Sequence, residues 1–232
     1  MSVKPNLTLA VCLCAMAGPA LAQEESAPSW TVDGTIGVVS DYRYRGYSLS
    51  DDAPAAQTGV TVSHASGAYA DVYLSTIDEY GLDEAGDGAE IEATLTLGWA
   101  GPIAGLDVDA AVATYQYPGG VDVAYYEIPV QVGQTRGIWT WSLGAAWAPK
   151  GQTALGDQDN RYLWSGLEAA PDAWPISIHG TVGFEDGAYA PDGKTDWTIG
   201  LSLPIGSAVL GADYVDSDAA DGALVASVFY AF

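Results

Sequence analysis

Polar and apolar residues alternate along most of the chain, and this period of two predicts β-strands with one wet face and one apolar face. Residues 90–99 are typical: one face carries Glu90 and Glu92, and the other carries Ile91 and Leu95. Most such segments are about 10 residues long, as a tilted strand that crosses a bilayer must be. Twelve segments are predicted, at residues 30–44, 54–63, 68–77, 89–99, 106–117, 124–134, 138–148, 161–170, 176–185, 195–204, 207–215 and 223–232.

The connections between these segments alternate in length, as the extracellular loops and periplasmic turns of outer-membrane barrels do. The long ones are 45–53, 78–88, 118–123, 149–160, 186–194 and 216–222. The short ones are 64–67, 100–105, 135–137, 171–175 and 205–206. Acidic residues gather in the long loops, whereas Arg136 and Asp172 are the charged residues of the short turns. The pattern predicts an all-β, transmembrane, antiparallel up-and-down β-barrel of 12 strands with both ends in the periplasm.

Two features indicate that the apolar face of this barrel points outward. The polar face carries many carboxylates, which are too costly to bury in a dry interior. Aromatic residues also stand at the ends of the apolar faces, where a membrane interface favours them. These are Trp99, Trp139, Trp147, Trp174, Trp197 and Tyr214.

The first residues have the features of a secretory signal. Lys4 precedes a short apolar run, and Ala20-Leu21-Ala22 is a cleavage site, so residues 1–22 are predicted to be removed. Residues 23–29 would form a short periplasmic segment and residues 30–232 the barrel. Because Cys12 and Cys14 both lie in the signal, no disulfide or thiolate metal site is expected. The protein is expected in the outer membrane of a Gram-negative cell after export through the secretory pathway.

The net charge of −23 makes nucleic acid an unsuitable partner, because phosphate binding needs a basic surface. The acidic loops raise the question of calcium, but the segments that begin at Asp83 and Asp216 lack the ligand spacing of an EF-hand. No metal and no cofactor are therefore expected. The predicted partners are small solutes, the barrel assembly machinery, and outer-membrane lipid and lipopolysaccharide, whose phosphates share divalent ions weakly with the loops.

A motif near the N-terminus resembles a known family. The stretch SDYRYRGYS at residues 40–48 is followed by Pro54-Ala55 and then by Ser66-Gly67-Ala68-Tyr69. This succession is similar to the TorF family of porin-like outer-membrane proteins, specifically over residues 34–77. Leu49 stands where that family usually has Gln. The resemblance implies a small outer-membrane channel of unspecified solute.

Period two places a set of charged side chains on the inward face. Arg43 and Arg45 are expected on the first strand, where they either brace the barrel by ion pairs or form a constriction that selects solute charge. Gly46 is expected to be a turn glycine. Because the set is mostly acidic, an open lumen should prefer cations or neutral solutes. The lumen candidates are Asp33, Asp41, Arg43, Arg45, Asp71, Glu90, Glu92, Asp107, Asp109, Glu127, Glu168, His179, Asp196 and Asp213.

Three functions are compatible with this barrel. The first is a porin-like channel for passive diffusion of small solutes, without catalytic residues. The second is a structural or surface-interaction barrel without an open pore, in which the acidic loops carry the function. The third is an outer-membrane lipid hydrolase. It would use Ser177 and His179 on one strand face, or His64 beside Ser63 and Ser66, but no oxyanion-stabilising group is recognisable.

The last strand carries alternating apolar residues and ends the chain in Phe232. This resembles the terminal strand of bacterial outer-membrane proteins, which the assembly machinery recognises in that class. Val228, Tyr230 and Phe232 are the predicted assembly signal, on the face turned toward lipid.

Overall fold

A computed structural model describes residues 29–171 and 173–232. The predicted signal peptide with Cys12 and Cys14, most of the short segment after it, and Asp172 lie outside the described residues. Among the described residues no helix is long and apolar enough to cross a membrane.

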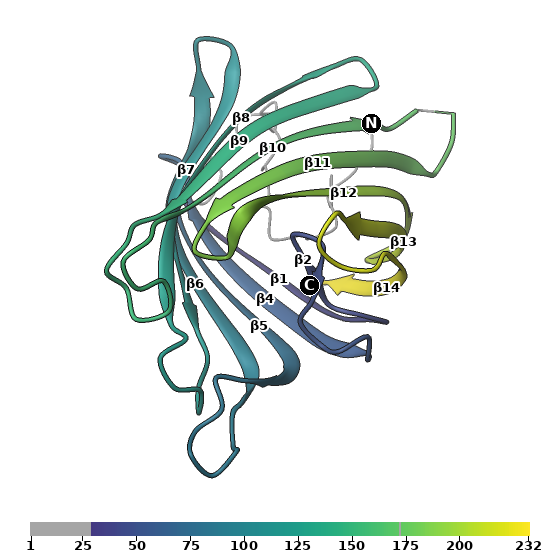
Figure 1. Cartoon of the computed structure of the whole chain (residues 1–232). Helices are drawn as coiled ribbons and strands as arrows, with labels where there is room; N and C mark the ends of the chain where they lie inside the picture. The colour runs from purple at the N-terminus through teal and green to yellow at the C-terminus, as the bar shows by residue number, and fades with distance from the viewer. Residues whose placement is uncertain (1–28, 172) are drawn as a thin grey trace.

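The described chain forms one closed antiparallel barrel of twelve strands (Figure 1), which confirms the predicted fold class. Each strand pairs with its neighbours in sequence, and the last pairs with the first. The barrel strands are β1 (Trp30–Val39), β4 (Ala55–His64), β5 (Ala68–Tyr80), β6 (Ala89–Ile103), β7 (Leu106–Gln116), β8 (Tyr125–Arg136), β9 (Trp139–Ala148), β10 (Asn160–Ala169), β11 (Ser177–Gly187), β12 (Ala190–Ile205), β13 (Ala208–Ser217) and β14 (Ala223–Ala231). Two further strands, β2 (Arg43–Tyr44) and β3 (Tyr47–Ser48), form a small separate hairpin.

The side chains are arranged with polar groups inside and apolar groups outside. Lys194 is 1% exposed and Glu92 is 2% exposed, whereas Leu224 is 74% exposed and Val32 is 66% exposed. A soluble barrel would have the opposite arrangement, because its apolar residues must leave water. Lipid solvates the outward apolar face. Closure of the barrel pairs the backbone N–H and C=O groups at the strand edges, which lipid could not hydrogen-bond.

The seam between β1 and β14 is sealed by aromatic rings on glycines. Outside, a Cβ added to Gly34 would lie 2.4 Å from the ring of Phe232, and inside, one added to Gly37 would lie 2.4 Å from the ring of Phe229. The backbones of Gly34 and Phe232 exchange two hydrogen bonds of 2.9 Å. The final residue therefore closes the barrel through both its backbone and its ring.

The first predicted strand is too long. β1 ends at Val39, so Arg43 and Arg45 do not lie on it as predicted. Residues 40–54 instead form a loop, which we call L1, and its tip folds into the small β2–β3 hairpin inside the ring of strands (Figure 1). The predicted extended chain is found only at Arg43 and Tyr44, which pair with Tyr47 and Ser48 and not with the barrel wall.

The predicted alternation of loop lengths fails at two connections. The predicted long loop 186–194 is a tight turn, because β11 and β12 continue to pair as far as Gly187 and Ala190. Gly187 and Gly193, both with positive φ, lie within these two strands. The connection between β10 and β11, predicted to be short at 171–175, spans 170–176.

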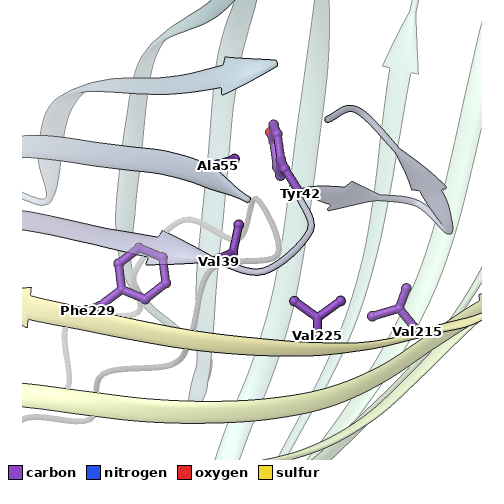
Figure 2. Packing of buried hydrophobic residues seen from close by; sticks show 6 residues of the cluster. All are labelled: Val39, Tyr42, Ala55, Val215, Val225 and Phe229. Atoms are coloured by element: carbon purple, nitrogen blue, oxygen red, sulfur yellow. The ribbon is translucent and has the colours of Figure 1, made fainter. Parts of the chain in front are cut away.

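A small apolar cluster joins the start of L1 to the seam. It consists of Val39, Tyr42, Ala55, Val215, Val225 and Phe229. Figure 2 shows Val39 and Tyr42 on the chain that leaves β1, with Val215, Val225 and Phe229 projecting from β13 and β14. This contact fixes the point at which L1 turns into the lumen.

Candidate functional site: the lumen and its inserted loop

The tip of L1 is a tight turn that presses on the barrel wall. Arg45 has a φ of 48° and Gly46 a φ of 86°, so both occupy the left-handed region that the turn requires. A Cβ at Gly46 would also lie 2.6 Å from Cβ of Ser217 on β13. Glycine at this position therefore allows the hairpin to lie flat against the wall, and the prediction that Gly46 is a turn glycine is confirmed.

Arg45 extends from this turn to the opposite wall of the lumen. Its Nη2 donates to both carboxylate oxygens of Glu127 on β8 at 2.8 Å, and its Nη1 donates to Glu185 on β11 at 2.8 Å. The guanidinium carbon also lies 4.2 Å from the ring centre of Tyr162 and 4.8 Å from that of Tyr44. This bidentate, stacked arrangement needs a planar guanidinium and is specific to arginine.

Lys194 holds the same turn from β12. Its Nζ lies 2.8 Å from Glu185 and donates to the backbone carbonyl of Arg45 at 2.5 Å. Asn160 on β10 donates to Glu185 at 2.9 Å, which satisfies the carboxylate further. Two basic and two acidic side chains, each at most 7% exposed, therefore balance in charge across the lumen.

Tyrosines anchor L1 to a third part of the wall. Tyr42 donates to Glu92 on β6 at 2.8 Å, and Tyr117 donates to the other oxygen of Glu92 at 2.9 Å. Tyr115 donates to Glu127 at 2.7 Å and stacks on Tyr125 with ring centres 4.5 Å apart. L1 is thus bound to β6, β8, β11 and β12, and it crosses the lumen.

Arg43 fixes the base of L1 rather than its tip. It pairs with Asp41 and with Asp52, and it donates to the carbonyl of Asp221 in the loop between β13 and β14 at 2.7 Å. Of the two arginines in the motif, Arg45 therefore crosses the lumen and Arg43 ties L1 to a neighbouring loop.

The half of the lumen near the short turns is acidic. Asp71 accepts a hydrogen bond from Thr61 at 2.7 Å, and Asp109 accepts one from Tyr69 at 2.9 Å. Asp213 Oδ1 lies 2.9 Å from Nε2 of His179. Asp33, Asp107 and Glu168 share the inward register of this half and are more exposed.

Among the described residues, no lysine or arginine pairs with Asp71, Asp109 or Asp213, although Arg43 lines the same cavity as Asp213. Arg43, Arg45 and Lys194 belong to the L1 contacts. Arg136, Lys150 and Arg161 are exposed at the strand ends and loops. The lumen therefore has a section at L1 where arginine and lysine pair with carboxylates, and an acidic section beneath it.

The lumen candidates fall into separate groups in the structure. Arg45, Glu127, Glu92 and Asp196 lie at L1, where Asp196 accepts a hydrogen bond from Tyr162 at 3.0 Å. Glu90 is exposed beside the irregular pairing of β5 with β6, and its place in the lumen stays a prediction. The remaining candidates are Asp41 and Arg43 at the base of L1, and Asp33, Asp71, Asp107, Asp109, Glu168, His179 and Asp213 in the acidic half.

The sequence analysis missed several residues of the L1 contacts. Glu185 shares the inward face of β11 with His179, and Lys194 shares that of β12 with Asp196, so period two contained the signal for both. Lys194 was placed in a loop because β12 begins five residues earlier than predicted. The tyrosines of L1 had no distinguishing signal, because the target of a loop folded into a lumen is not encoded in strand alternation.

The two histidines of the proposed hydrolase make different contacts: His179 Nε2 lies 2.9 Å from Asp213 Oδ1, and His64 lies at the end of β4. His64 Nδ1 lies 2.8 Å from Ser66 Oγ and also accepts the backbone N–H of Ser66 at 3.1 Å, which is a local turn contact.

The loop that begins at Asp83 is organised by its own backbone, since Asp83 accepts N–H groups from Asp87 and Ala85. These hydrogen bonds lower the pKa of Asp83.

The chain matches the model of one protein family. The model of the family described as "Bacterial protein of unknown function (Gcw_chp)" matches residues 22–230. The chain belongs to the Gcw_chp family. No curated protein matches this Gcw_chp chain.

Solved porin structures share the fold of the Gcw_chp protein. The KdgM porin has a TM-score of 0.60 at 7% identity, over 87% of this chain and 98% of that one. The NanC porin has a TM-score of 0.53 at 9% identity, over 87% and 98%. A KdgM porin described as in complex with disordered oligogalacturonate has a TM-score of 0.58 at 7% identity, over 87% and 98%. At these identities the likeness concerns the fold.

Proposed function

We propose that this protein is an outer-membrane channel for passive diffusion of small solutes and that it prefers cations or neutral molecules. The observation that carries the proposal is the acidic half of the lumen, where Asp71 and Asp109 are hydrogen-bonded to neutral side chains and no described lysine or arginine pairs with them. Fixed carboxylates in a low-dielectric wall concentrate cations and repel anions. The porin fold, the outward apolar face and the TorF resemblance support the location in the membrane.

We place the narrowest section of this channel at L1. Arg45 and Lys194 pair with Glu127 and Glu185 there, so these two carboxylates are compensated within the constriction. Selection by charge would then come from the acidic half, and selection by size from L1. A polyanion such as the oligogalacturonate bound to the KdgM porin suits this lumen poorly, because it would meet Asp71 and Asp109, which have no basic partner.

The test is the conductance of the purified protein in planar bilayers. In a gradient of potassium chloride the reversal potential should have the sign of potassium permeation, because the fixed charges are acidic. A neutral sugar about as large as a small hydrated ion should enter proteoliposomes faster than the analogue of that sugar that carries a carboxylate. A reversal potential of the opposite sign would contradict the acidic-lumen proposal.

A closed barrel that acts through its surface is the second candidate, and the burial of the L1 contacts favours it. Arg45, Glu127, Glu185 and Lys194 are all nearly inaccessible to solvent. In that case the wild-type protein would not conduct. Deletion of an acidic loop would then abolish a binding phenotype and leave permeability unchanged. Recognition of lipopolysaccharide and of the assembly machinery is proposed for both functions.

A further inference from the structure

A cavity of about 40 Å³ lies between the base of L1 and the seam strands. Its polar lining comes from Asp41 and Arg43 of L1, Gln57 of β4, Asp213 of β13 and Ser227 of β14. Val39, Tyr42, Val215, Val225 and Phe229 complete the wall, and Figure 2 shows these five side chains grouped where L1 leaves β1. We call it the seam cavity.

Three side chains of the seam cavity have an oxygen without a hydrogen-bond partner. These oxygens are Gln57 Oε1, Asp213 Oδ1 and Ser227 Oγ. Gln57 is 3% exposed, Ser227 is 5% exposed and Asp213 is 7% exposed, so bulk water does not solvate them. Buried polar atoms of this kind normally have a partner, and each one that lacks it calls for an occupant. Asp213 Oδ1 lies 2.9 Å from His179 Nε2 but lacks hydrogen-bond geometry there.

The chemistry of these oxygens points to a positive charge. The Ser75 hydroxyl donates to the carbonyl of Thr76, so it accepts from Gln57 Nε2 and leaves the Gln57 carbonyl oxygen for another partner. An amide oxygen, a carboxylate and a hydroxyl oxygen are hard ligands of the type that alkali and alkaline-earth cations take.

Charge and size restrict the cation. Asp41 is paired with Arg43, which leaves Asp213 as the carboxylate of the cavity without a permanently charged partner. A single uncompensated charge suits a monovalent ion better than calcium, which takes six to eight oxygen ligands and usually several carboxylates. Since one water needs about 10–15 Å³ of such space, the cavity accommodates a small ion with one or two waters and excludes larger organic cations.

We propose that the seam cavity is a binding site for a small monovalent cation such as Na⁺ or K⁺, held by Gln57, Asp213 and Ser227. The bound ion links L1 to β4, β13 and β14, and thereby stabilises the position of L1 against the seam. This inference does not depend on an open pore, because a closed barrel holds the same site.

The first test measures unfolding by urea in detergent, in the chlorides of Na⁺, K⁺ or N-methyl-D-glucamine at equal concentration. A ligand that binds the folded state shifts the unfolding midpoint. The midpoint should be higher in Na⁺ or K⁺ than in N-methyl-D-glucamine, which is too large to enter. Asp213→Asn and Ser227→Ala should each reduce this difference, and two variants keep the test valid where one fails to fold.

The matched control is Asp109→Asn. Asp109 is also an inward aspartate, is 4% exposed and has one oxygen without a hydrogen-bond partner, but it lies on β7 and does not line the cavity. It should keep the full difference between the salts. An equal loss in Asp109→Asn, equal midpoints in all three salts, or stabilisation by Ca²⁺ alone would overturn the proposal.

The second test is diffraction from crystals grown with Rb⁺ in place of K⁺. An anomalous peak in the seam cavity of the wild-type protein, absent in Asp213→Asn, is expected. Ordered water without an anomalous peak would overturn the assignment. Neither experiment measures conduction, so a failed channel proposal and a failed cation site are distinguishable.

Discussion

Individual inward residues were predictable where they lie on a strand whose register the sequence makes plain. Glu92, Asp109 and Glu127 are buried on the polar face that alternation assigned to them. Arg45 was identified from a motif, but its partners were not, because Glu127 and Glu185 lie on strands far away in sequence. Burial converts these ion pairs from weak surface contacts into strong constraints, since an unpaired charge inside a protein is costly.

At this scale the effect of Arg45→Ala is predicted. Its loss leaves Glu127 without its basic partner and removes the tip of L1 from the wall, which should cost about 3–5 kcal/mol in the free energy of unfolding. Urea unfolding followed by tryptophan fluorescence measures it. Arg161→Ala is the control, because its pair with Asp159 is exposed and contributes about 0–1 kcal/mol. Similar losses in both variants would show that Arg45 is not an anchor.

Among the elements, the barrel strands were predictable and L1 was not. Twelve strands follow from local alternation, and each pairs with a sequence neighbour, so their order needs no long-range information. The β2–β3 hairpin has the same alternation as a wall strand. It nevertheless leaves the wall, since the chain from Ser40 to Tyr44 turns inward after Val39. Packing of Tyr42 with Val215 and Val225 decides that course, and such contacts are invisible to periodicity.

The position of L1 is predicted to depend on the glycine at its tip. Gly46→Val introduces a side chain where Ser217 already lies, so it should displace L1 and raise the single-channel conductance. Gly151→Val is a closely matched control: Gly151 has the same φ of 86°, but a Cβ there meets nothing within 4 Å. Both variants force a valine into a left-handed backbone conformation, but only the side chain at position 46 would contact the barrel wall. Unchanged conductance in Gly46→Val would contradict a constriction formed by L1.

For the whole molecule, closure rests on the seam. β1 pairs with β4 over its full length from Trp30 to Val39, but with β14 only from Thr35 to Val39. The exchange of hydrogen bonds between Gly34 and Phe232 extends that short pairing by one step. The sequence indicated that Phe232 faces lipid, but its ring contact with Gly34 required the register of strands at opposite ends of the chain.

Deletion of Phe232 is predicted to impair assembly of the barrel rather than transport through it. The deletion removes two backbone hydrogen bonds and the ring over Gly34, both at the closing step. The fraction of folded barrel in the outer membrane, read from its heat-dependent mobility in gel electrophoresis, should fall. Phe232→Leu keeps the backbone pairing and should retain more folded protein than the deletion. Equal yields for the deletion and the wild-type protein would contradict a closing role.

The seam also imposes an order in time. The second neighbour of β1 is β14, the last barrel strand in chain order, so β1 keeps an unpaired edge until β14 has been synthesised. Strands β4 to β13 each receive their second partner from the next barrel strand in the chain. The nascent barrel is consequently an open sheet with two unpaired edges, and any chain released before β14 is made keeps both of them. Such fragments should associate with one another through these unpaired edges, because the edge of a second fragment can then pair in place of the missing β14.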